Sequence, residues 1–141
     1  MIDSKNIMNS TDCIIYCTGN ISINELRIKI AAFVGSAKIE VSFIEKDFYE
    51  LSVYVNDEFD TNGQVNFPDG FLYFKFIIDV GFNPNSEIRK CADEISKILR
   101  WLWEMGMPSV ASCDYEDLLP ENGGYNSKVI PWVSDSLRSK T

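Results

Sequence analysis

Residues 70–106 read GFLYFKFIIDVGFNPNSEIRKCADEISKILRWLWEMG, and this stretch decides the fold. Residues 70–80 are apolar on both faces, which is typical of a strand at the centre of a sheet. Residues 86–106 repeat apolar side chains every three or four positions, which predicts an amphipathic helix. Ser86 can cap this helix, and Gly106 can end it. The stretch therefore predicts a central strand followed by a long helix.

The other elements are predicted on both sides of that stretch. A helix is expected over residues 23–34, with Ser22 or Asn24 as its N-cap and Gly35 as its C-cap. Runs rich in β-branched and aromatic residues predict four further strands, at residues 13–17, 37–45, 48–55 and 109–112. Asn62-Gly63 predicts a hairpin turn before residues 70–80, because both residues tolerate positive φ.

The resulting order is β-α-β-β-β-α-β. Two right-handed β-α-β crossovers would place both helices on one face of a single sheet. We therefore predict an α+β fold, a two-layer sandwich with a mixed, mostly antiparallel sheet, similar to a ferredoxin-like arrangement with an additional strand. The 141 residues fit one domain (1–141). Flexible ends are expected at residues 1–11 and 134–141.

Bulk charge restricts the class of partner. The chain carries a formal net charge of −8, which argues against binding nucleic acid or an anionic membrane and favours a basic protein partner. The polar start of the chain does not read as a signal peptide, and no stretch has the length of a membrane span. We expect a cytoplasmic protein.

The residue types present also limit the chemistry. The chain has no histidine, so Ser-His-Asp and Cys-His machinery is excluded. Four cysteines (Cys13, Cys17, Cys91 and Cys113) show no C-x-x-C spacing and are expected as buried free thiols rather than disulfides or zinc ligands. No cofactor, metal site or catalytic residue is predicted.

Acidic residues are concentrated in two segments. Residues 45–69 hold seven acids and one base, and residues 114–121 hold four acids and no base. If both crossovers give parallel strands, the turn at residues 45–47 and the loop at residues 114–121 lie at one end of the sheet. Residues 56–60 then lie at the other end. The acids of the two segments should therefore form one acidic end and one smaller, separate patch.

The sequence SCDYEDLLPENGGY, residues 112–125, is open to several interpretations. It lacks the spacing of an EF-hand, although a Mg²⁺ or Ca²⁺ site, or a pair of catalytic carboxylates, remains an alternative. A solvated acidic loop is a second alternative. Density of one charge favours a docking loop for a basic partner, because it raises association rates. Trp101 lies on the polar face of its helix and is either covered by residues 129–133 or exposed as an interface anchor.

Two stretches carry a resemblance to a known family: FPDGFLYFKF at residues 67–76 and WLWEMGMPSVASCDYEDLLPENGGY at residues 101–125. A strand, a helix ending in W-x-x-G, a short strand with an acidic loop and a GGY motif follow one another in this order. The pattern resembles small bacterial immunity proteins of polymorphic toxin systems, such as contact-dependent growth inhibition. The resemblance covers residues 67–125.

That resemblance implies a cytoplasmic inhibitor, not an enzyme, that binds one cognate toxin domain. A basic nuclease domain would suit an acidic inhibitor. We predict a partner-binding surface with Tyr115 as an aromatic anchor, surrounded by Asp114, Glu116, Asp117, Glu121, Glu45 and Asp47, and a fallback patch of Asp57, Glu58 and Asp60. The alternatives are a small carboxylate- or metal-dependent hydrolase and a generic protein-interaction adaptor that uses Trp101 and the sheet edge.

Overall fold

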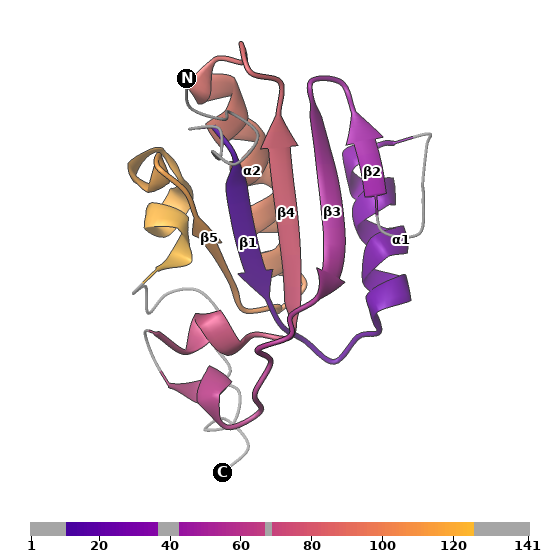
Figure 1. Cartoon of the computed structure of the whole chain (residues 1–141), viewed down its shortest axis with the longest axis vertical. Coiled ribbons are helices and arrows are strands. Elements are labelled where there is room, and N and C mark those ends of the chain that lie inside the picture. Colours follow the sequence, from indigo (N-terminus) through magenta and orange to yellow (C-terminus); the bar gives the residue numbers. More distant parts are fainter. Residues whose placement is uncertain (1–10, 37–42, 67–68, 126–141) are drawn as a thin grey trace, which may run out of the picture.

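The computed structural model describes residues 11–36, 43–66 and 69–125. Within them the elements follow the predicted order β-α-β-β-β-α-β, and the α+β class is confirmed (Figure 1). The strands are β1 (Cys13–Cys17), β2 (Phe43–Lys46), β3 (Tyr49–Val55), β4 (Phe76–Phe82) and β5 (Ser109–Ser112). The helices are α1 (Ile23–Val34) and α2 (Ile88–Glu104). Residues 37–42 of the predicted second strand, and nearly all of both predicted flexible ends, lie outside the described residues.

The five strands form one sheet in the order β2-β3-β4-β1-β5, so β4 is central as predicted. Every pairing is antiparallel, and the prediction of a mixed sheet is wrong. The error lies in β1, which runs opposite to β2 rather than parallel to it. Eight residues separate α1 from β2. They can reach up to ~26 Å, more than the ~18 Å length of α1, so this connection is long enough to reverse the chain direction.

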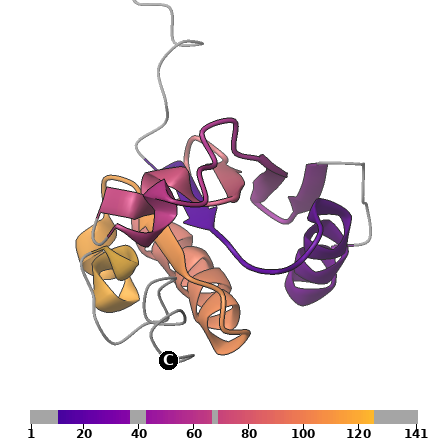
Figure 2. The ribbon, with the colours of Figure 1, turned by 90° about the horizontal axis from the view of Figure 1, so that it is seen from below.

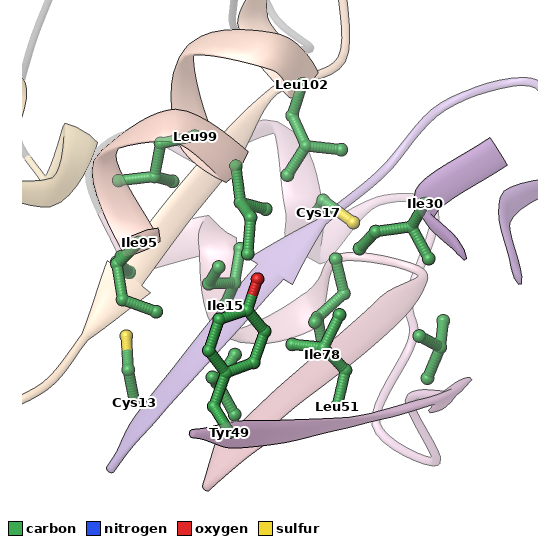
Figure 3. Close-up of a cluster of buried hydrophobic side chains, with 14 of the residues drawn as sticks. Cys13, Ile15, Cys17, Ile30, Tyr49, Leu51, Ile78, Ile95, Leu99 and Leu102 are labelled. Carbon is green, nitrogen blue, oxygen red and sulfur yellow. The ribbon is translucent and has the colours of Figure 1, made fainter. Parts of the chain in front are cut away.

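Both helices lie on the same side of the sheet, which gives the predicted two layers (Figure 2). Strand residues alternate between the faces, and those facing the helices form the core. The core contains Ile15, Leu51 and Ile78 from the strands, packed against Ile30 of α1 and Leu99 of α2 (Figure 3). Cys13, Cys17 and Cys91 are buried in it as free thiols.

The helix ends follow the predicted signals with one exception. The Ser22 side chain accepts a hydrogen bond from the N–H of Glu25, and Gly35 ends α1 in the left-handed conformation. Gly106 adopts φ 79° after α2, and its N–H donates to the carbonyl of Trp103. Ser86 does not cap α2, because the N-cap position is Glu87, which makes no capping side-chain hydrogen bond.

The connection between β3 and β4 corrects the hairpin prediction. Asn62 has φ −79°, and residues 63–73 contain two short 3-10 helices, η2 (Gly63–Val65) and η3 (Asp69–Tyr73). Phe71 and Phe74 pack with Val110 on the side of the sheet away from the helices. Phe71 and Phe74 therefore cover part of that face, whereas Leu72 and Tyr73 are exposed. The central strand begins only at Phe76.

Trp101 joins the two helices. Its ring stacks on Phe33 of α1, with ring centroids 4.7 Å apart and an interplanar angle of 13°. The side chain is half-buried in this contact. Residues 129–133, the predicted cover, lie outside the described residues.

Candidate functional site

The 45–47 turn and the 114–121 loop lie at the same end of the sheet, as predicted. Pairing directions make β2, β4 and β5 run the same way, so all three end at the upper end of the sheet in Figure 1. The 45–47 turn follows β2 there, and the 114–121 loop follows β5. However, β2 and β5 are the two edge strands, with three strands between them. The segments therefore share an end but do not form one cluster.

Tyr115 is not an exposed anchor, and that prediction is wrong. Its side chain is only 1% exposed and belongs to the core. The hydroxyl donates a hydrogen bond of 2.6 Å to the carbonyl of Thr11, which ties the acidic loop to the residues before β1. Burial, followed by nearby thiols and Asp12, raises the pKa of Tyr115 far above its ordinary value.

The four acids of that loop do not all face outward. Glu116 is half-buried. Its carboxylate accepts a hydrogen bond of 3.1 Å from the N–H of Cys113, and this bond stabilises the turn after β5. Asp114, Asp117 and Glu121 are exposed. Leu118 of the same loop shares a depression with Lys90, Lys97 and Arg100 of α2, so basic side chains lie close to this acidic loop.

The fallback patch lies at the opposite end, where β3 ends. Asp57, Glu58 and Asp60 are exposed there. The buried amide of Asn56 fixes this corner by donating to the carbonyls of Leu72 and Phe74, at 3.0 and 2.8 Å. The patch is therefore separate from the acids at the upper end, as the sequence predicts.

The sheet brings together acids that the sequence argument does not combine. Strand register places Glu45 opposite Glu50, and Glu50 opposite Gly81. Continuing the β1–β4 register by one position places Asp12 opposite Gly81 on the other side. In the next row Asp79 lies between Ser52 and Ile14. We call Asp12, Glu45, Glu50 and Asp79 the acidic face; alternation puts all four on the side away from the helices.

Gly81 leaves a notch within the acidic face. A Cβ atom at Gly81 would lie 3.8 Å from Cγ of Glu50 and 3.9 Å from Oδ1 of Asp12. A depression of about 570 Å³ opens here, lined by Asp12, Glu45, Asp47 and Glu50 among others. Among the described residues of its lining, Lys46 is the one basic side chain, and its Nζ lies 3.8 Å from Oδ2 of Asp47.

Three observations describe the electrostatics of this face. Partial burial raises the pKa of Asp79, and the Asp12 carboxylate raises it further. Burial and then Asp79 raise the pKa of Tyr54, which lies on the same face. The N–H of Phe82 donates to Oδ1 of Asp12 at 3.2 Å and holds that carboxylate at the edge of the notch. On this face, Asp12 therefore acts on Asp79, and Asp79 acts on Tyr54.

The acidic face was missed because its members are distant in sequence. Glu45 and Glu50 both lie in the acidic segment 45–69, but Asp12 and Asp79 lie outside both acidic segments. Two signals together could have found them. Strand alternation places every second residue of a strand on the same face, and antiparallel register aligns these residues across neighbouring strands. The wrong direction assigned to β1 removed that signal for Asp12.

Among the described residues, no three or more Cys, Asp or Glu side chains are arranged to hold a metal ion. None of the described helices has the length and apolar character needed to cross a membrane. No known family model, curated protein or solved structure matches the chain.

Proposed function

We propose that this protein is an immunity protein that binds and neutralises a basic toxin domain, with the acidic face as the main contact surface. The observation that carries the proposal is the row formed by Glu45, Glu50 and Asp12, with Gly81 of β4 between Glu50 and Asp12. Asp79 lies in the adjacent row on the same face. Together with the net charge of −8, such a surface would attract a basic domain over a distance and orient it during association.

Within the row, Glu45 and Glu50 are like charges directly opposite one another on adjacent strands, a pairing that on its own disfavours a sheet. Arginine or lysine side chains of a partner would interact favourably with both carboxylates, and the notch over Gly81 leaves space for one of them.

Neutralisation requires the inhibitor to meet the toxin inside the cell, so the proposed location is the cytoplasm. The test uses the carboxy-terminal domain encoded by the open reading frame directly upstream of this gene. Expression of that domain should arrest bacterial growth, and co-expression of this protein should restore it. Persistent arrest, with both proteins shown to be soluble, argues against an immunity function.

The contact surface is tested separately with two matched double variants. Glu45→Lys/Glu50→Lys changes the acidic face, and Asp57→Lys/Glu58→Lys makes the same charge change at the opposite end. The first variant should weaken toxin binding by calorimetry and reduce its dependence on salt, because steering charges are lost. The second should bind like the unmodified protein. The reverse ranking would place the contact at the fallback patch.

A further inference from the structure

Cys13 and Cys113 face each other at the end of the β1–β5 ladder. The register pairs Ile15 with Ala111 and Ile14 with Ser112, so one further step places Cys13 opposite Cys113. Alternation puts both side chains on the helix side of the sheet, and Cys113 packs against the core that contains Cys13. All four cysteines, including these two, are free thiols.

Cys13 and Cys113 occupy a non-hydrogen-bonded pair, the type of antiparallel pair that brings side chains closest. The N–H of Thr18 donates to the carbonyl of Pro108, which makes positions 18 and 108 a hydrogen-bonded pair. Pairs alternate along an antiparallel ladder, so positions 13 and 113, five steps away, form a non-hydrogen-bonded pair. The Cα atoms of such pairs lie ~4.5 Å apart, within the ~4.4–6.8 Å range of disulfides.

The backbone of Cys113 agrees with this assignment. In a non-hydrogen-bonded pair the N–H points away from the partner strand. The N–H of Cys113 instead donates to Oε2 of Glu116, at 3.1 Å.

The two thiols are chemically unequal. The side-chain interaction with Cys113, followed by burial, raises the pKa of Cys13 well above its ordinary value. The same interaction, helped by the backbone N–H of Tyr115, lowers the pKa of Cys113 although burial opposes that shift. Cys113 is also partly exposed, whereas Cys13 is buried. Cys113 is therefore the accessible thiol with more thiolate character, and Cys13 is its neighbouring proton donor.

We propose that Cys13 and Cys113 form a dithiol pair that hydrogen peroxide oxidises to a cross-strand disulfide. The Cys113 thiolate attacks one peroxide oxygen, the O–O bond breaks, and the departing hydroxide takes a proton to become water. Cys13 then attacks the sulfur of the Cys113 sulfenic acid. The S–O bond breaks, and hydroxide leaves with the Cys13 proton as a second water. Two thiols and one peroxide thus give one disulfide and two waters.

The experiment treats the full chain in its native state with hydrogen peroxide and counts free thiols after quenching and unfolding. The count should fall from four to two, with a mass loss of two hydrogens, and peptide mapping should find Cys13 joined to Cys113. Cys17→Ser is the matched control, because Cys17 lies on the same strand and face; its count should fall from three to one.

Two further variants separate the roles of the thiols. Cys113→Ser should keep all three remaining thiols under the same treatment. Cys13→Ser, checked for native circular dichroism, should stop at a Cys113 sulfenic acid that dimedone traps. A disulfide that contains Cys91, or thiol loss that appears only after unfolding, would overturn the assignment.

Discussion

Tyr115 lies within the most acidic stretch of the chain, yet its ring is among the largest fully buried side chains. The sequence could not reveal this, because the stretch forms short 3-10 turns, η4 (Glu116–Leu118) and η5 (Pro120–Gly124), which have no periodicity long enough to identify a buried face. What fixes the ring is a hydrogen bond to Thr11, 104 residues away in the chain. Contacts of this range depend on the completed sheet.

Replacing Tyr115 by Phe should lower the free energy of unfolding by about 1–3 kcal/mol, because the buried Thr11 carbonyl loses its donor. Tyr125→Phe is a matched control, since its hydroxyl makes an exposed contact of 3.4 Å with Asp69 and should change stability little. Urea denaturation measures both. Equal effects for the two variants would show that the Thr11 hydrogen bond contributes little.

Asp79 gives a pH-dependent prediction. Its pKa is raised in the fold by burial and by Asp12, so the folded state favours the protonated acid. The stability from this preference is present below the unfolded pKa of about 3.9, and it is lost as pH rises through the raised folded pKa. Asp79→Asn does not ionise, so its stability advantage over the unmodified protein should grow from about pH 3 to pH 7. Denaturation across this range measures the difference, and a constant difference contradicts the prediction.

At the scale of elements, sequence patterns within one helix predicted its type and ends, but they did not predict how the strands pair. The 3.6-residue period and the caps Ser22 and Gly35 fixed α1 correctly. The direction of β1 was missed because it depends on which strands β1 joins, β4 and β5, and no local pattern encodes that choice. The hairpin predicted at Asn62-Gly63 is wrong for a related reason. This dipeptide signals a two-residue turn, but twenty residues separate β3 from β4, and the described part of this connection contains η2 and η3 instead.

The stack of Phe33 on Trp101 is the clearest contact between the two helices. A double-mutant cycle of Phe33→Ala and Trp101→Ala should give a coupling free energy of about 0.5–1.5 kcal/mol, because the stacked rings interact beyond the area that they bury. Ile28→Ala replaces an exposed residue of α1 and should show almost no coupling with Trp101→Ala. If the two cycles give the same coupling, the stack does not hold the helices together.

The whole molecule has two unlike sides. The helices cover one face of the sheet (Figure 1). The opposite face carries an apolar part, where Phe71 of η3 packs with Val110, and the acidic face defined above. Charge counts predict that a basic partner would suit the chain, and the predicted strand directions place the 45–47 turn and the 114–121 loop at one end. Only the strand register shows that Asp12, Glu50 and Asp79 come together on the sheet between that turn and that loop.

Glu50→Lys should separate stability from binding at this acidic face. The new lysine would lie opposite Glu45, so a repulsive pair becomes an attractive one, and the free energy of unfolding should rise by at most about 1 kcal/mol. Under the proposed function the same change should weaken toxin binding, because a positive charge enters the notch beside Gly81. Urea denaturation and calorimetry measure the two effects. If binding weakens only with a loss of stability, the face contributes through folding; if stability rises while binding weakens, the acids serve recognition at the expense of the fold.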